Sequence, residues 1–164
     1  MLVRGSKSIL ELRDLKTCRF SKDLYLGWLQ DVENNKYIES VRKNFSMSEL
    51  DAYLDSKMAA QNVEFWGIFV DSDSFIGTVK LDPIDTENGS AWLGIMIGDV
   101  SQRAKGYGRI VMQQVAQYAL ENLKLKELFL GVHKDNLPAL KLYEKQGFQI
   151  IETSEVSFVM KKDL

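Results

Sequence analysis

The sequence has little cysteine and no long apolar run. Its single cysteine, Cys18, cannot form an internal disulfide, so the disulfide framework of small secreted proteins is excluded and a reducing compartment is favoured. No apolar stretch approaches the roughly 20 residues that span a bilayer. The first seven residues also lack the apolar core of a signal peptide. We therefore expect a cytoplasmic protein without a membrane partner.

An excess of positive charge is lacking as well. The chain carries 21 Lys and Arg against 23 Asp and Glu, which gives a net charge of -2 and a pI near 5.5. Surfaces that bind nucleic acid usually show a basic excess, so we expect no nucleic-acid partner. The hydrophobic content of 45% and the charged content of 27% are typical of soluble globular proteins. A length of 164 residues indicates a single domain, residues 1–164, with a substantial core.

The most informative stretch runs from Ala91 to Gly108. An apolar run closed by Gly98 predicts a buried strand, and a basic loop with two glycines then leads directly into a helical pattern. The first N–H groups of a helix have no internal partner and the helix dipole is positive there, so this arrangement attracts anions. Gly106 and Gly108 allow the backbone to approach a ligand closely. The stretch predicts a small-anion site, although on its own it could also be an ordinary surface turn.

Two nucleotide-binding motifs are excluded at this loop. A P-loop requires Lys and then Ser or Thr after its last glycine, whereas Gly108 is followed by Arg109 and Ile110. A Rossmann fingerprint would place its third glycine at Val111, whose branched side chain would block close packing of the helix on the strand. The anion site therefore belongs to neither of these folds.

The remaining periodicity predicts a mixed α+β domain with one βαβ crossover. The expected strands are residues 8–15, 64–70, 75–81, 91–97, 127–132, 148–151 and 156–160. The expected helices are residues 21–31, a helix opened by the capping box of Ser46 and Glu49, a helix after the glycine loop, and a helix from Asn136 to Gly147. Residues 32–45 are expected to connect two helices, and residues 82–90 to form a turn region. The strand at 127–132 is expected to run parallel to the central strand, because a helix connects the two.

Two motifs in this order carry a resemblance to a known family. The first is Arg103-Ala104-Lys105-Gly106-Tyr107-Gly108, which fits [QR]-x-x-G-x-[GA], and the second is N-x-x-A-x-x-x-Y-x-x-x-G-F from Asn136 to Phe148. Over nearly its whole length the sequence resembles the GNAT-superfamily N-acetyltransferases. Residues 28–38 and 76–81 are similar to the branch with ribosomal-protein N-terminal acetyltransferases, whose relatives acetylate small amines and amino sugars. The resemblance implies a mostly antiparallel sheet with one parallel crossover, a splayed strand pair, and helices on both faces.

The resemblance also implies acetyl-CoA as co-substrate and no metal. The CoA pyrophosphate would be held by the loop Arg103, Ala104, Lys105, Gly106, Tyr107, Gly108 and Arg109. The pantetheine arm would lie in the splayed gap beside Ile95, Met96 and Ile97, where a backbone N–H would polarise the thioester carbonyl. Asn136 would contact the cofactor as well as cap its helix.

The implied reaction is direct attack of a neutral amine on the thioester, which needs an acid for the departing thiolate and a base for the ammonium. Tyr143 matches the family position of the acid, and its alternative role is packing on the helix face. The central strand carries no acidic residue. The candidate bases are Glu33, Glu39, Asp82, Glu87, Asp99 and His133; a base acting through water, or no protein base, stays open.

The acceptor is expected to be a primary amine, either a protein N-terminus or a small amino compound such as an amino sugar. Residues 32–45 and 82–90 are expected to flank the acceptor site, because loops on a rigid scaffold tend to carry specificity. Their carboxylates, Glu33, Glu39, Asp82, Asp85 and Glu87, could hold a cationic amine or could be solvated surface. The alternative function is a non-catalytic acyl-CoA sensor, and either a monomer or a homodimer is expected.

Overall fold

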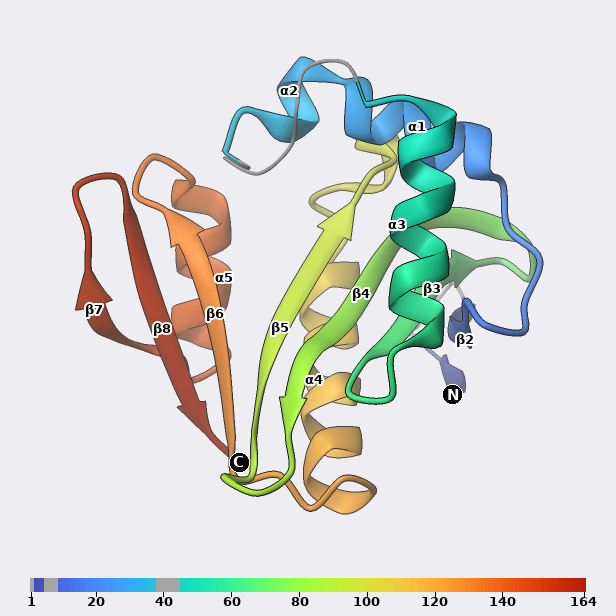
Figure 1. The fold of residues 1–164 in the computed structure, drawn as a ribbon. Coiled ribbons are helices and arrows are strands. Elements are labelled where there is room, and N and C mark those ends of the chain that lie inside the picture. Colours follow the sequence, from blue (N-terminus) through green and yellow to red (C-terminus); the bar gives the residue numbers. More distant parts are fainter. Residues whose placement is uncertain (1, 5–8, 38–44) are drawn as a thin grey trace.

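The computed structural model describes residues 2–4, 9–37 and 45–164, which form an eight-stranded sheet in the order β1-β2-β3-β4-β5-β6-β8-β7 (Figure 1). The strands are β1 Leu2–Arg4, β2 Ile9–Asp14, β3 Glu64–Val70, β4 Ser74–Asp85, β5 Ser90–Ile97, β6 Glu127–His133, β7 Gln149–Thr153 and β8 Ser157–Asp163. The helices are α1 Lys22–Gln30, α2 Val32–Asn35, α3 Met47–Ala59, α4 Tyr107–Glu121 and α5 Leu137–Lys145, with a 3-10 turn at Val100–Gln102. The mixed α+β class is confirmed.

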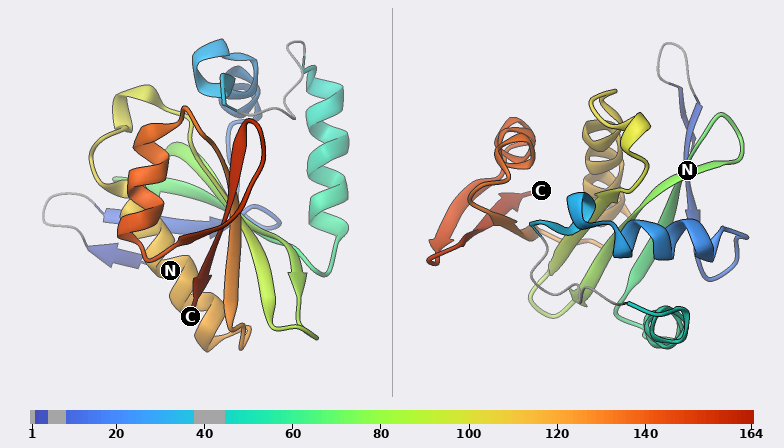
Figure 2. Two further views of the ribbon diagram at one scale, coloured as in Figure 1. Left: turned by 90° about the vertical axis from the view of Figure 1, so that its left-hand side faces the viewer. Right: turned by 90° about the horizontal axis from the view of Figure 1, so that it is seen from above.

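Helices cover both faces of the sheet, as Figure 2 shows from above. On the front face, α1 and α3 pack over β3 and β4 through a cluster that includes Tyr25, Trp28, Leu50, Leu54 and Phe65. On the back face, α4 packs over the central strands through a second cluster that includes Ile68, Val79, Val111, Val115 and Leu128. α5 lies behind β6 (Figure 1). The sheet therefore separates two apolar cores, and most of β3 and the first part of β4 are buried between them.

The helix starts follow the capping signals in the sequence. The Ser46 side chain accepts from the Glu49 N–H while the Glu49 carboxylate accepts from the Ser46 N–H, which completes the predicted capping box. Ser21 likewise caps α1. α5 starts after Asn136 and ends before Gly147, whose φ of 88° is the left-handed conformation that glycine adopts without strain.

Two connections differ from the sequence-based prediction. β4 continues to Asp85 after a shift of register between Leu81 and Ile84, so residues 82–85 of the predicted turn region are strand, whereas residues 86–89 form the turn. The shift allows β4 to keep pairing with β5, and those backbone hydrogen bonds outweigh the local turn preference of the segment. The predicted connection at 32–45 contains the short helix α2, whose start is capped by Asp31; its residues 38–44 lie outside the described residues, as does Ser8.

The parallel pair at the centre of the sheet is short. β5 and β6 pair only at Ser90–Glu127, Ala91–Leu128 and Trp92–Phe129. Beyond Trp92, β5 pairs with β4 alone and β6 with β8 alone, so the two strands diverge toward their C-terminal ends (Figure 1). The predicted splayed strand pair is confirmed, and we call the space between the diverging strands the split.

Every helix within the described ranges is too short or too polar to cross a bilayer.

Candidate active site

The end of β5 is held by a tight contact with α1. A Cβ atom at Gly98 would lie 2.1 Å from the Trp28 ring, so only glycine lets α1 pack here. The N–H groups of Gly98 and Asp99 both donate to the Ile76 carbonyl of β4. Asp99 then caps the 3-10 turn through the Ser101 N–H. These contacts fix the direction in which the chain leaves the sheet toward the glycine loop.

The loop presents a row of unpaired backbone donors. Ala104 and Gly106 have φ values of 58° and 84°, and α4 begins directly after Gly106. In the described chain, the N–H groups of residues 104–109 have no hydrogen-bond partner, and Ile110 is the first to donate, to the Gly106 carbonyl. Backbone turns that alternate handedness in this way gather N–H groups into an anion-binding concavity, and the helix dipole adds to its positive potential. A Cβ atom at Gly106 would meet nothing within 4 Å, so the loop is open on that side.

The Arg103 side chain has a second role that the sequence does not reveal. Its Nε donates to the Ile97 carbonyl at 3.0 Å and its guanidinium donates to the Asn34 amide oxygen. The Asn34 amide in turn donates to the Gly98 carbonyl at 3.2 Å. Arg103 therefore ties α2 to the end of β5. No local pattern could have identified Asn34, because it lies 69 residues away in the chain.

The predicted pantetheine residues line the split. Ile95 and Ile97 pack toward the back-face core, whereas Met96 packs toward the front-face core. All three follow Trp92, where the pairing with β6 ends. Among the described strands this segment therefore pairs with β4 alone, and the Ile97 carbonyl also accepts from Arg103.

Tyr143 lies on α5, which contacts the glycine loop. The Leu142 side chain lies 3.3 Å from the position that a Cβ atom would take at Gly108. Tyr143 is half-buried, with its ring centroid 6.1 Å from that of Phe148, and burial raises the pKa of its phenol to about 12. Its hydroxyl has no hydrogen-bond partner among the described residues. Asn136 caps the same helix, since its Oδ1 accepts from the Ala139 N–H at 3.3 Å.

Three of the candidate carboxylate bases, Asp82, Asp99 and Glu33, are already bonded to other groups. Asp82 binds Lys57 at 2.6 Å and Lys80 at 3.0 Å; burial alone would raise its pKa, but these two hydrogen bonds lower it. Asp99 is held by the main-chain and side-chain groups of Ser101. Glu33 pairs with Lys36, Glu87 lies exposed in the turn after β4, and Glu39 lies outside the described residues.

His133 differs from these because it projects from the end of β6, one of the diverging strands. Its Nδ1 accepts from the Asp135 N–H at 3.2 Å, and its ring lies 5.6 Å from the ring of Tyr37. With Nδ1 engaged as acceptor, the neutral ring carries its proton on Nε2. No group of three or more potential metal ligands occurs among residues 2–4, 9–37 and 45–164.

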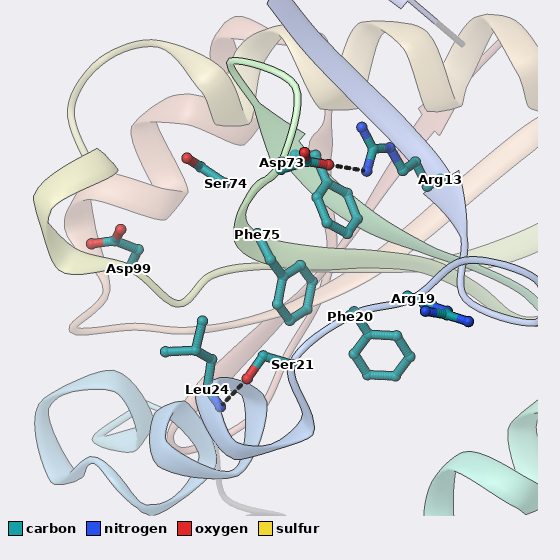
Figure 3. A pocket seen from close by; sticks show the side chains of 10 residues that line it. Arg13, Arg19, Phe20, Ser21, Leu24, Asp73, Ser74, Phe75 and Asp99 are labelled. Atoms are coloured by element: carbon teal, nitrogen blue, oxygen red, sulfur yellow. Dashed lines mark hydrogen bonds and ion pairs between the residues drawn. The ribbon is translucent and has the colours of Figure 1, made fainter.

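A shallow pocket of about 530 Å³ lies elsewhere, between the start of α1 and the β3–β4 turn (Figure 3). The rings of Phe20 and Phe75 lie in it, with centroids 5.5 Å apart, and Arg13 reaches Asp73 across it at 3.2 Å. None of the predicted cofactor residues lines this pocket. Of the predicted site residues only Asp99, a candidate base that caps the turn before the glycine loop, lines this pocket.

Comparison with known proteins places this geometry in a family. Residues 10–149 match the acetyltransferase (GNAT) domain. The chain is 28% identical over 130 residues to acetyltransferase PseH of Campylobacter jejuni, covering 79% of this chain and 78% of that one. It is 32% identical over 84 residues to spermine/spermidine N(1)-acetyltransferase of Bacillus subtilis, covering 49% of this chain and 54% of that one.

Solved structures share the fold. Spermidine N-acetyltransferase from Vibrio cholerae, in complex with CoA and spermine, matches with a TM-score of 0.81 at 21% identity, over 94% of this chain and 95% of that chain. Campylobacter jejuni N-acetyltransferase PseH matches with a TM-score of 0.69 at 22% identity, over 94% and 97%. These relatives do not single out the ribosomal-protein branch that residues 28–38 suggested. With the split sheet, the glycine loop and the domain match in agreement, the chain belongs to the GNAT acetyltransferases and is an acyltransferase.

Proposed function

We propose that the protein transfers the acetyl group of acetyl-CoA to a primary amine on a small molecule, by direct attack of the amine on the thioester. The observation that carries this proposal is the row of unpaired N–H groups at residues 104–109, directly beside a split between two parallel strands. Two comparisons support it: the Vibrio cholerae neighbour holds CoA, and the Bacillus subtilis relative is named for polyamine acetylation.

In this proposal the glycine loop and the split bind different parts of the cofactor. The N–H groups of residues 104–109 bind the pyrophosphate, and exposed Lys105 adds positive charge beside them. The pantetheine arm lies along β5 at Ile95, Met96 and Ile97, where it completes the strand edge that β6 leaves unpaired. A backbone N–H of this edge donates to the thioester carbonyl and stabilises the charge that develops there. Asn136 supports the other wall of the site by fixing the start of α5.

Tyr143 supplies the proton for the departing sulfur. As the amine nitrogen bonds to the acetyl carbon, the bond from carbon to sulfur breaks, and the phenol donates to the thiolate. With a pKa of about 12 the phenol is protonated at neutral pH, so it has a proton to donate in every catalytic cycle. Because an ordinary thiol has a pKa near ~8.5, the transfer is completed by rapid reprotonation of the tyrosinate, either by the proton that the attacking nitrogen loses as it becomes the amide or by water.

The amine loses its proton to water in this proposal rather than to a dedicated carboxylate. Asp82, Asp99 and Glu33 are each engaged with lysine or amide partners. An amine with a low pKa is already partly neutral at pH 7 and needs no strong base. His133 is the second candidate, because it projects from the strand that forms one side of the split.

A panel of amines separates this function from that of a non-catalytic acyl-CoA sensor. Acetyl-CoA is incubated with ring amines, polyamines and peptides that have a free N-terminus; thiol release and the mass of the product are measured. We expect thiol release that depends on the amine, and a product heavier by one acetyl group. Binding of acetyl-CoA in calorimetry without thiol release for any amine would indicate the sensor. Acetylation of hydroxyl groups alone would contradict the amine acceptor.

A further inference from the structure

The front face of the split carries a distinct set of side chains. Along β5 and β6, alternate residues point to opposite faces of the sheet, and Leu93, Leu128 and Leu130 belong to the back-face core. The residues between them point to the front: Trp92, Gly94 and Met96 from β5, and Phe129, Gly131 and His133 from β6. We call these six residues the front row.

The front row begins with an aromatic platform. Trp92 and Phe129 are the last residues that pair between β5 and β6, and their rings stack with centroids 5.8 Å apart at an interplanar angle of 29°. Trp92 is nevertheless 41% exposed, which is unusual for so large a ring at the centre of a sheet. The following positions, Gly94 and Gly131, have no side chain, and a Cβ atom at Gly131 would meet nothing within 4 Å. A flat apolar surface therefore lies next to open space.

A lysine with an unused donor stands beside this space. The Lys80 side chain lies against Gly94, with its Cε 3.3 Å from the position of a Cβ atom there. Its Nζ binds the Tyr53 hydroxyl at 2.9 Å and Asp82 at 3.0 Å, which leaves the third ammonium donor available. Because Asp82 is shared with Lys57, the two lysines and one carboxylate carry one uncompensated positive charge.

Three of the described carboxylates near this region are already bonded. Glu33 is held by Lys36, and Asp31 accepts from amides of α2. Glu127, which precedes the platform on β6, is held by Lys161, and the latter also pairs with Asp163. A polyamine requires carboxylates that are free to neutralise several positive charges, whereas the free group at Lys80 is a cation.

We propose, on the basis of the proposed function, that the front row selects an acceptor whose amine is carried on a ring and which also bears an anionic phosphate. The ring stacks on Trp92 and Phe129, the phosphate binds the free donor of Lys80, and the amine reaches the thioester beside Met96. Ring stacking and a charge-assisted hydrogen bond then act together, and a polycation such as spermidine is disfavoured by the same lysine.

Matched amines test this selection. The kcat/KM is measured for glucosamine, glucosamine 6-phosphate, UDP-glucosamine and spermidine. We expect the kcat/KM of at least one of the two phosphorylated ring amines to exceed that of glucosamine by about ten- to hundredfold, which is the contribution of a hydrogen bond to a charged group. Spermidine should have the lowest kcat/KM of the four amines. Spermidine as the best acceptor, or equal kcat/KM with and without phosphate, would overturn the inference while the proposed amine acetylation stands. Failure of all amines would instead remove the proposed function, and this inference with it.

Variants of Lys80 and Trp92 test whether these two residues select the acceptor. Lys80→Met should abolish the advantage of the phosphorylated amine, whereas Lys80→Arg should retain most of it. Lys22→Met removes a more exposed ion pair, the one between α1 and Asp51 on α3, and should leave the advantage unchanged. Trp92→Ala should raise the KM for ring amines by about tenfold, and Trp92→Phe should restore it. Acetyl-CoA affinity should be unchanged in all of these variants. A Lys80→Met protein that keeps the advantage of the phosphorylated amine contradicts the assignment to Lys80. If Lys80→Met lowers the melting temperature, the Lys80→Arg variant decides whether the charge at this position gives the advantage.

Discussion

Replacing Tyr143 by Phe removes one hydroxyl and keeps the ring that packs near Phe148. A positioned acid contributes about 10²- to 10⁴-fold to the rate, so kcat should fall by at least a hundredfold. At 1.36 kcal/mol per tenfold, the loss corresponds to about 2.7–5.4 kcal/mol of transition-state stabilisation. Since the hydroxyl has no hydrogen-bond partner among the described residues, its removal breaks no bond in the folded protein. The melting temperature should therefore change little.

The assay follows thiol release at saturating acetyl-CoA, together with calorimetric affinity for CoA and the melting temperature. Tyr118→Phe is the matched control, because Tyr118 is also half-buried on a helix but packs on Trp66 at 5.2 Å, away from the split. Burial raises the pKa of Tyr143 to about 12, so this group should cause no alkaline fall in wild-type kcat below about pH 11. A Tyr143→Phe protein with kcat within about threefold of wild type would refute the acid role.

Three further predictions follow from described contacts. Gly106→Val forces a branched residue into a φ of 84°, at a strain of about 1–2 kcal/mol, and should weaken CoA binding by about tenfold. Gly147→Val, with a φ of 88° but remote from the loop, should lower only the melting temperature. Calorimetric measurement of CoA affinity separates the two variants. Asp82→Asn should destabilise the protein by about 1–3 kcal/mol in urea unfolding at pH 7. Because folding lowers the pKa of Asp82 from 3.8, that stabilisation is present above pH 3.8 and is lost as the pH falls through the lowered value, so the stabilities of variant and wild type should converge as the pH is taken below 3.8. Ser46→Ala should cost about 1 kcal/mol of stability through the lost capping box and leave activity unchanged, which thermal unfolding and the thiol assay measure together.

Local rules made much of the fold predictable from the sequence. Ser46 with Glu49, and Asn136 with Gly147, each act within a few residues, and the structure confirms the helix ends that they predict. The prediction of an anion site at the loop was equally local, because it depends on glycine and on the start of a helix; anion binding itself stays a prediction. The continuation of β4 to Asp85 was missed, because pairing with a distant strand overrode the turn preference of its own residues.

The site was predictable only in part. The bond from Arg103 to Asn34 and the position of Lys80 against Gly94 depend on the packing of elements far apart in the chain. The splayed pair came from the family resemblance, since no residue pattern states where two parallel strands stop pairing. One signal in the sequence could have identified the exposed platform of Trp92 and Phe129. It is the presence of an aromatic residue near the start of each of two strands that are expected to be parallel.

The three residue pairs that join β5 to β6 have a thermodynamic consequence. Beyond Trp92 the two strands no longer pair, so the half-sheet of β6, β8 and β7 is attached to the rest of the sheet mainly at one end. A cofactor that binds in the split binds the folded state alone, so CoA at a hundred times its Kd should add about 2.7 kcal/mol to the free energy of unfolding. We expect amide hydrogen exchange in β6 and at Ile95 to Ile97 to slow on CoA binding far more than exchange in β3, which is paired on both sides whether or not the ligand is present.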